Sequence, residues 1–286
     1  MWTGDHQPVI IDFHTHIFPD EVRQARDEYL ARDAWFGTLY ENPRNKLASA
    51  EDIVSSMEAA GVDRTVIFGF PWRDAKLCAW HNDYIIECVR RYPDKLIGFA
   101  CVQPLDAKDA QELARCLDAG LMGLGELGPD GQRFDIEDRR VLEASAEVLQ
   151  HYDRPLLTHA SEPMGHSYAG KGQTFPWKLL KLAQNFPDLK LVLAHWGGGL
   201  PFYGLMPEVG EHLRNVYYDT AATSYLYRFD VFPVAARLVG ADRILWGTDY
   251  PLLSQAKMLA RIRESGLEQD QLEAILGGNA ARLLRL

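Results

Sequence analysis

Residues 9–16 read Val-Ile-Ile-Asp-Phe-His-Thr-His, an apolar run that ends in two histidines. The apolar part, Val9–Phe13, is typical of a strand buried on both faces, as the strands of a parallel sheet are. Side chains at positions i and i+2 of a strand point to the same side, so His14 and His16 can reach one metal ion together. Taken alone, this spacing is weak evidence, because histidines also occur in ordinary protein cores.

Similar apolar runs recur along the chain and alternate with segments of helical periodicity. The expected strands are Val9–Phe13, Thr65–Phe70, Leu96–Val102, Met122–Leu127, Pro155–His159, Lys190–His195, Val216–Asp219 and Arg243–Gly247. The expected helices include Ala50–Ala60, Cys78–Arg91, Ala107–Ala119, Glu137–His151, Trp177–Asn185 and Val231–Leu238. Eight strands alternating with helices indicate parallel βα units, hence a barrel or a doubly wound sheet.

Two connections after expected strands are longer than usual. They run from Ile17 to Ser49 and from Ala160 to Pro176, and long loops in compact domains often serve as lids or binding loops. The C-terminal stretch Glu268–Leu286 predicts two short helices, the second starting near Asn279 as its N-cap. No linker or repeat divides the 286 residues, so we expect one domain over 1–286.

The overall charge narrows the range of partners. A formal net charge of −10 argues against nucleic acid or an anionic membrane as the main partner. Met1–Pro8 lacks the layout of a signal peptide, and no apolar run approaches the roughly 20 residues that span a bilayer. We therefore expect a cytoplasmic protein, whose four cysteines stay reduced as small buried side chains: Cys78, Cys88, Cys101 and Cys116.

Ionisable residues fall repeatedly at the ends of the expected strands. Besides His14 and His16, the set comprises Glu126, His159, His195, Asp219 and Asp249. In a barrel of parallel strands these ends face one mouth, where active sites are built. Imidazole and carboxylate groups gathered there suit Zn²⁺ above all, and also Mn²⁺, Fe²⁺ or Co²⁺.

Several of these residues have alternative interpretations. A Glu inside an apolar strand is costly unless it is paired or metal-bound, so Glu126 predicts a ligand, with an ion pair to Arg73 as the alternative. Asp249 can ligate a metal and accept a proton from metal-bound water, or it can cap a helix near Ser254. Asp219 can orient a ligand histidine or cap the following helix.

Cations and hydroxyls on the expected mouth loops could bind a substrate carboxylate, although each could equally be a solvated surface residue. These candidates are Arg73, Tyr168, Lys171 and Arg228. The glycines that follow Trp196 predict a turn, since a phosphate loop would need a Lys-Ser/Thr pair that is absent. The remaining histidines are expected not to be ligands: His6, His81, His151, His166 and His212.

Longer motifs around these residues resemble the amidohydrolase superfamily, in particular its amidohydrolase 2 branch with the aminocarboxymuconate-semialdehyde decarboxylase-like enzymes. The resemblance rests on Asp12–His16, Thr158-His159, Ala194–Gly198, Tyr218-Asp219, Trp246–Pro251 and Gly278–Leu284, in this order along the chain. It implies a distorted (β/α)₈ TIM barrel that holds one or two divalent metal ions.

The resemblance also implies roles for single residues. His14 and His16 match the ligands on strand one, His159 the ligand on strand five, and Asp249 the acid on strand eight. His195 matches a histidine that acts in catalysis where one metal is bound and ligates the second where there are two. Glu126 instead resembles a metal-contacting Glu of TatD-like deoxyribonucleases, and the lysine that bridges two metals in other branches has no counterpart here.

These observations favour a metal-dependent hydrolase of a small-molecule ester, lactone or amide. Asp249 would take the proton of a metal-activated water, and His195 would stabilise the developing oxyanion or assist the leaving group. The alternative is non-oxidative decarboxylation, or hydration, of an unsaturated or aromatic carboxylic acid, with the same two residues handling protons. A metal-binding scaffold without activity is a third reading. Trp and Tyr residues on the long loops would suit a homodimer contact.

Overall fold

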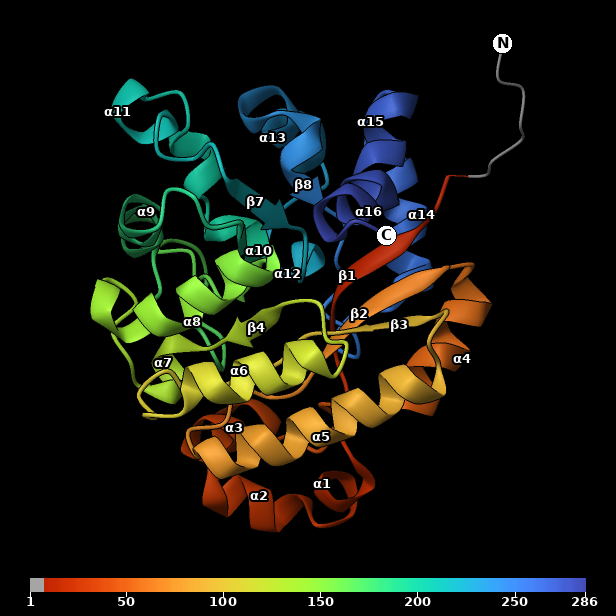
Figure 1. The fold of residues 1–286 in the computed structure, drawn as a ribbon. Helices are drawn as coiled ribbons and strands as arrows, with labels where there is room; N and C mark the ends of the chain where they lie inside the picture. The colour runs from red at the N-terminus through yellow and green to blue at the C-terminus, as the bar shows by residue number, and fades with distance from the viewer. Residues whose placement is uncertain (1–7) are drawn as a thin grey trace.

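The computed structural model describes residues 8–286, and its centre is a ring of eight short parallel strands surrounded by helices (Figure 1). The expectations on His6 and on the segment Met1–Pro8 fall almost wholly outside the described residues. The strands are β1 Ile11–His16, β2 Arg64–Phe68, β3 Leu96–Gly98, β4 Leu124–Leu127, β5 Leu156–Thr158, β6 Leu191–Leu193, β7 Val216–Asp219 and β8 Ile244–Leu245.

The ring consists of two hydrogen-bonded sheets, β1-β2-β3 and β4-β5-β6-β7-β8. One seam is joined by the Ala100 amide, which donates to the Gly123 carbonyl at 2.9 Å. The other is joined by the amides of Phe13 and His16, which donate to the carbonyls of Trp246 and Tyr250, each at 2.8 Å. A doubly wound sheet would leave two free edges, so the expected (β/α)₈ barrel is the observed fold, distorted at its two seams.

The helices that follow the strands agree with the sequence periodicity to within a few residues. Ser49 begins α4 with a reciprocal capping box to Asp52, and Gly61 ends it at φ 71°. The main outer helices are α4 Ala50–Ala60, α5 Ala75–Arg91, α6 Asp109–Asp118, α8 Arg139–Tyr152, α9 Pro176–Asn185, α13 Val231–Val239 and α14 Gln255–Arg263. Shorter elements between them are α7 Pro129–Gln132, α10 Ala194–Gly197, η1 Leu200–Tyr203, α11 Pro207–Gly210, α12 Thr223–Leu226 and η2 Ala241–Arg243.

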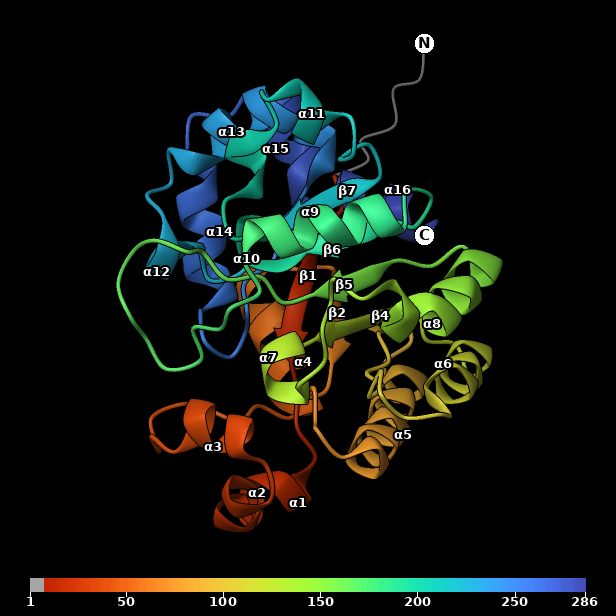
Figure 2. The ribbon, with the colours of Figure 1, turned by 90° about the vertical axis from the view of Figure 1, so that its left-hand side faces the viewer.

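The first long connection is not an irregular loop but three short helices that project from the barrel (Figure 2). These are α1 Asp20–Gln24, α2 Arg26–Arg32 and α3 Ala34–Tyr40. They share a separate apolar cluster that includes the buried rings of Phe18, Phe36, Phe70 and Trp72. The carboxylate of Asp33 caps α3 and also accepts the amide of Arg73, which fastens this insertion to the loop after β2.

The C-terminal prediction is wrong at Asn279. Helix α15 Gln269–Glu273, the π-helical turn η3 Ala274–Gly278 and α16 Asn279–Leu284 follow one another without a break, so Asn279 lies inside helical backbone and caps nothing. Its buried amide instead donates to the carbonyls of Ala241 and Ile244, each at 2.7 Å. The tertiary contact with β8 therefore outweighs the capping tendency of Asn.

Two smaller expectations concern the cysteines and membranes. All four cysteines are buried and free of disulfides. Among the described residues, no helix is long and apolar enough to cross a bilayer.

Candidate metal centre

The carboxyl ends of β1, β4 and β8 bring four predicted ligands together. The Nε2 atoms of His14 and His16 lie 3.3 Å apart. Oε2 of Glu126 lies 3.7 Å from the first and 3.6 Å from the second. Oδ1 of Asp249 lies 3.8 Å and 3.5 Å from the same two nitrogens. Four potential ligand atoms thus surround one small volume.

The other oxygen of Glu126 faces a second pair of histidines, from the ends of β5 and β6. Oε1 lies 3.0 Å from Nδ1 of His159 and 3.5 Å from Nε2 of His195. Three ligand atoms, one from each of Glu126, His159 and His195, lie within 4.8 Å of one another. Glu126 therefore stands between the two groups, its carboxylate shared by both.

Three of the four histidines in the cluster are oriented by protein oxygens on the side of the ring that faces away from the cluster. Nδ1 of His14 lies 2.8 Å from Oδ2 of the fully buried Asp219. Nδ1 of His195 lies 3.3 Å from the Ala221 carbonyl, and Nδ1 of His16 lies 3.5 Å from the Gly69 carbonyl. With Nδ1 as the donor, each ring presents the lone pair of Nε2 to the cluster. Of the two roles considered for Asp219, the structure shows the orienting one.

The turn after β6 also positions His195. His195 and Trp196 have φ values of 54° and 59°, a left-handed conformation that non-glycine residues adopt at a cost. Oδ1 of Asp219 accepts the His195 amide at 3.0 Å and thereby holds this turn. The glycines after Trp196 form a turn, as expected, and a Cβ at Gly198 would collide with the Ser161 carbonyl.

The electrostatics of the cluster favour a bound cation. Burial disfavours the charged form of His14, but the carboxylates of Asp219, Glu126 and Asp249 outweigh it and raise its pKa to about 10. Burial would raise the pKa of Glu126, yet the neighbouring histidines hold it well below its usual range. The pKa of Asp249 is likewise lowered against burial, first by the hydrogen bond with His16. The site stabilises positive charge among ionised carboxylates.

Divalent metal ions fit this arrangement. Nε2 lone pairs and carboxylate oxygens are all acceptors, and acceptors packed together need a cation between them. Ligands about 2.1 Å from a tetrahedral ion lie about 3.4 Å apart, close to the 3.3–3.8 Å found around His14 and His16. Nε2 of His159 is buried without a hydrogen-bond partner, a further unsatisfied donor atom for an ion.

Sequence reasoning missed Asp12, which ties β1 to the segment after β8. Its fully buried carboxylate accepts hydrogen bonds from the Thr248 hydroxyl at 2.6 Å, the Thr248 backbone amide at 2.9 Å and the Gln255 side-chain amide at 2.9 Å. Burial raises its pKa to about 6 despite these hydrogen bonds. Asp12 thus holds His14 and Asp249 in register. The argument applied to Glu126, an acid inside an apolar strand, would have found it.

Tyr40, at the end of α3, is the second residue that sequence reasoning missed. Its pKa is raised by burial and then by the negative charges of Asp249 and Glu126. Its ring packs against Phe18 and Phe36. No local pattern in the sequence indicates this, because the insertion reaches the mouth only in the folded chain.

The four candidate substrate residues are not brought into one place. Tyr168 and Lys171 lie on the loop after β5, where the Tyr168 hydroxyl and the Lys171 ammonium both lie 3.2 Å from Glu162. Arg73 is exposed and forms no ion pair with Glu126. The Arg228 side chain is 90% exposed and pairs with Asp230. Their roles remain predictions.

The structure places Asp249 in the cluster and the other described histidines outside it. Ser254 itself caps α14, which leaves the Asp249 carboxylate to the cluster. His81 is buried in hydrogen bonds to the backbone and Trp72, and His151, His166 and His212 lie outside the ligand groups.

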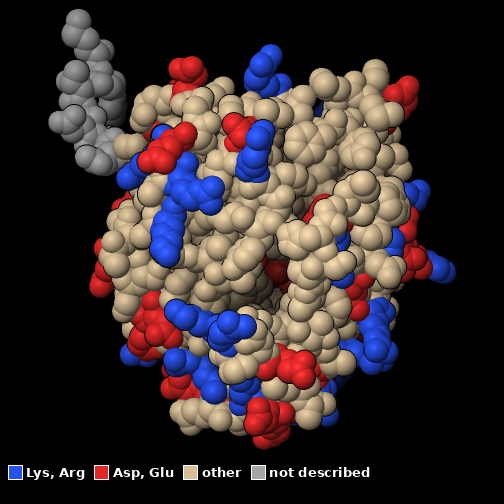
Figure 3. Space-filling model, turned by 180° about the vertical axis from the view of Figure 1, so that it is seen from behind, with Lys and Arg blue, Asp and Glu red and all other residues tan. Residues whose placement is uncertain are grey.

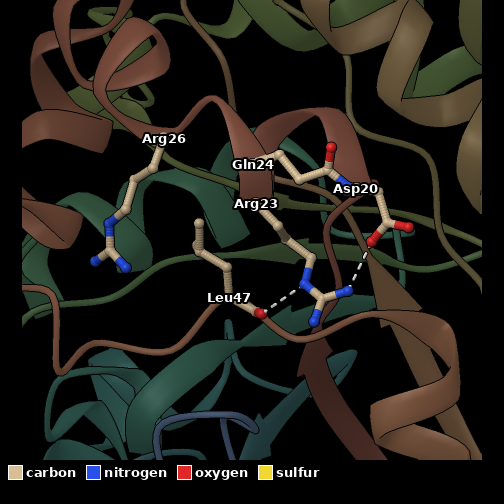
Figure 4. Close-up of a pocket in the computed structure, with 5 residues that line it drawn as sticks. All are labelled: Asp20, Arg23, Gln24, Arg26 and Leu47. Atoms are coloured by element: carbon tan, nitrogen blue, oxygen red, sulfur yellow. Dashed lines mark hydrogen bonds and ion pairs between the residues drawn. The ribbon is translucent and has the colours of Figure 1, made fainter.

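Two surface hollows differ in character. A cavity of about 410 Å³ is lined by Asp20, Arg23 and Gln24 of α1, Arg26 of α2 and Leu47 before α4 (Figure 4). Its arginines are engaged with Asp20 and with backbone carbonyls, and it contains none of the cluster residues. The face in Figure 3 has a hollow near its centre, with acidic atoms at its floor and mainly uncharged residues around it.

Comparison with known proteins identifies relatives. The family model described as "Amidohydrolase" matches residues 11–286. The chain is 24% identical to a gamma-resorcylate decarboxylase from a Polaromonas species, over 72% of this chain and 75% of that protein. It is 23% identical to a 2-amino-3-carboxymuconate-6-semialdehyde decarboxylase from Dictyostelium discoideum, over 96% and 91% of the two chains.

Solved structures share the fold. A 5-carboxyvanillate decarboxylase from Sphingomonas paucimobilis superposes with a TM-score of 0.81 at 19% identity, covering 98% of this chain and all of the other. A dihydroxybenzoic acid decarboxylase from Polaromonas, with bound manganese and 2-nitroresorcinol, superposes with a TM-score of 0.75 at 22% identity, covering 98% of each chain.

These relatives overturn the expectation of a hydrolase. The relatives found by sequence are decarboxylases of carboxylic acids, which favours the alternative, non-oxidative decarboxylation. The hydrolytic interpretation relied on Glu126, but a ligand set does not by itself select the reaction, because the same ions can polarise different substrates.

Proposed function

The chain belongs to the amidohydrolase family, and on that premise we propose that it is a metal-dependent decarboxylase of an aromatic or unsaturated carboxylic acid. The observation that carries the proposal is the convergence of six ligand residues at the barrel mouth, in a chain whose relatives are decarboxylases. These residues are His14, His16, Glu126, His159, His195 and Asp249. The side chains of His16, His159 and Asp249 keep 11–22% of their surface exposed, so a small molecule can reach them.

The reaction replaces a carboxylate by a proton. The bond between carbon and carboxylate breaks, CO₂ leaves, and the electron pair left on the carbon takes up a proton. A divalent ion would supply Lewis acidity that binds and polarises the substrate. Mn²⁺ is the ion bound in the related dihydroxybenzoic acid decarboxylase, and His/carboxylate ligands also suit Zn²⁺.

Asp249 and His195 are the proposed proton-transfer groups. Burial would lower the pKa of His195, but its hydrogen bond to Glu126 and the charges of Asp249 and Glu126 raise it above its usual value, which favours the protonated imidazole. Asp249, with its lowered pKa, is ionised there and can accept one. Positioned acids and bases of this kind contribute about 10²- to 10⁴-fold to a rate.

Tyr168 and Lys171 are the proposed substrate-binding residues among the four candidates. They lie on the loop that follows β5 and begins with His159, and the Lys171 side chain is only 17% exposed. A substrate carboxylate that displaced the Glu162 carboxylate would still accept from the Tyr168 hydroxyl and the Lys171 ammonium. Arg73 and Arg228, more exposed, could contact a substrate only from the rim of the mouth.

Measurement of CO₂ release tests the function. We expect the metal-loaded protein to decarboxylate at least one acid in a panel that includes gamma-resorcylate, 5-carboxyvanillate and 2-amino-3-carboxymuconate-6-semialdehyde. A chelator should abolish this activity, and Asp249→Asn should reduce it about 100-fold or more. His151→Asn, on the exposed face of α8, is the matched control and should leave it unchanged. Absence of CO₂ release from the whole panel with Mn²⁺ and with Zn²⁺ would overturn the proposal.

A further inference from the structure

The loop of residues 160–175 and the helical insertion after β1 meet at a single glycine. Gly170 is buried, although Ala169 before it is exposed. A Cβ at Gly170 would collide with Cδ2 of Leu39 on α3, and the φ of 87° at this position also favours glycine. Figure 2 shows the loop reaching down to α3, with α2 on the opposite side of α3. Leu39 therefore covers Gly170 so closely that no side chain fits between them.

From this contact we infer that α3 positions the loop of residues 160–175, with Leu39 as the positioning residue that fixes where Tyr168 and Lys171 stand. The inference deepens the proposed function and rests on its assignment of these two donors to substrate binding. Leu39 acts on the substrate only through the loop.

The end of α3 is fixed well enough to support a second segment. Nδ2 of Asn45 donates to the Leu39 carbonyl at 2.6 Å. The guanidinium of Arg26 donates to the Tyr40 carbonyl at 2.9 Å and to the carbonyls of Asn42 and Asn45 at 2.8 and 2.9 Å. One arginine thus gathers three carbonyls at and after the end of α3, and the backbone that presents Leu39 is held in place.

A third segment, α7, contacts both α3 and the loop. A Cβ at Gly131 of α7 would lie 2.5 Å from Cδ1 of Trp35, so α7 and α3 touch. The neighbouring Asp130 accepts the Gln173 amide at 2.8 Å and the Thr174 hydroxyl at 2.7 Å. The loop is therefore fixed by polar contacts near its end and by the apolar contact with α3 beside the two donors.

Lys171 follows Gly170 directly and carries a reporter of loop position. Its Nζ donates to the carbonyls of Met164 and His166 at 2.7 and 3.1 Å and lies 5.7 Å from the centre of the Tyr168 ring. A shift of Gly170 would disturb these contacts together. Trypsin must draw Lys171 out of them to cleave after it, so the cleavage rate reports how firmly the loop is held.

The test compares trypsin cleavage after Lys171 among variants of the full chain loaded with Mn²⁺, measured by mass spectrometry. Leu39→Ala should raise the rate about 5- to 10-fold, because part of the apolar contact of a leucine is lost. Leu39→Met keeps the contact and should be cleaved like the wild type. Leu30→Ala is the matched control, since Leu30 on α2 is also partly buried against the apolar cluster of the insertion, and it should change the rate little.

An exchange of size between the two positions tests the contact directly. Gly170→Ala should also speed cleavage, because the added methyl group meets Leu39 and the left-handed backbone is costly for alanine. In the double variant with Leu39→Ala the methyl group fills the vacated space, so the two effects should be less than multiplicative. With an acid that the wild type decarboxylates, Leu39→Ala should raise KM several-fold and leave kcat within about two-fold.

Three results would overturn the inference. They are equal cleavage rates of Leu39→Ala and Leu30→Ala, fully multiplicative effects in the double variant, and an unchanged KM in an active Leu39→Ala enzyme. If no acid of the panel is decarboxylated, the proposed function fails by itself, and the cleavage rates still decide whether Leu39 positions the loop.

Discussion

His81 shows how the barrel treats a histidine that is not part of the metal centre. Nε2 lies 2.9 Å from the Ile17 carbonyl, while Nδ1 accepts the Trp72 indole N–H at 3.1 Å. The ring is 1% exposed, and burial lowers its pKa to about 4. The folded protein therefore contains neutral His81, in contrast to His14, whose pKa the surrounding carboxylates raise.

This difference predicts a pH dependence of stability at the residue scale. A folded pKa below the unfolded value of about 6.5 stabilises the protein above that pH, and the stabilisation is lost as pH falls towards 4. Between pH 7.5 and 5 the loss should be about 2 kcal/mol. His81→Gln lacks this titration, so its deficit in the free energy of unfolding, measured with urea, should shrink by that amount over the same interval. A deficit independent of pH would contradict the assignment.

At the scale of elements, the loop of residues 160–175 is held to the barrel mainly by Asp130 of α7. Oδ1 of Asp130 accepts the Gln173 amide at 2.8 Å, and Oδ2 accepts the Thr174 hydroxyl at 2.7 Å. The Ser161 hydroxyl accepts the Gly172 amide at 3.1 Å and closes the base of the loop. Tyr168 and Lys171 are thus presented by a segment whose position depends on one carboxylate.

Asp130→Ala should release this loop without disturbing the metal ligands. We expect faster cleavage within residues 160–175 by a protease and a KM several-fold higher, with an unchanged metal content. Loss of hydrogen bonds to a charged group should also cost about 1.5–3 kcal/mol of stability. Asp188→Ala, at an exposed position, is the control and should show none of these effects. An unchanged KM of the Asp130→Ala variant would show that the loop of residues 160–175 does not contribute to substrate binding.

At the scale of the whole molecule, ligands from β1, β4, β5, β6 and β8 meet at one mouth, so a bound ion would tie together both sheets of the ring. An ion present at about 100 times its Kd adds about 2.7 kcal/mol of stability per site. For a domain of this size that corresponds to a rise in Tm of about 5–10 °C. Thermal unfolding in Mn²⁺ and in chelator measures it, and equal Tm values would count against a metal centre.

The sequence by itself determined much of this molecule. Alternation of buried strands and amphipathic helices is a local pattern, and it predicts the eight strands and main helices because each depends on a few consecutive residues. Parallel strands place their carboxyl ends at one mouth of the barrel. The order of the strands therefore predicts that His14, Glu126, His195 and Asp249 lie close together. The boundaries shifted by a few residues, and the helical insertion after β1 was missed.

Only the tertiary structure decided how those groups meet. The contacts of Glu126 with four histidines, the Asp12 tie to Thr248 and the packing of Tyr40 against Phe18 depend on distances between segments far apart in the chain. Neither periodicity nor spacing encodes such distances, because they follow from how the ring closes. The reaction was misjudged for a related reason: ligands determine where an ion binds, whereas the chemistry depends on the substrate held above it.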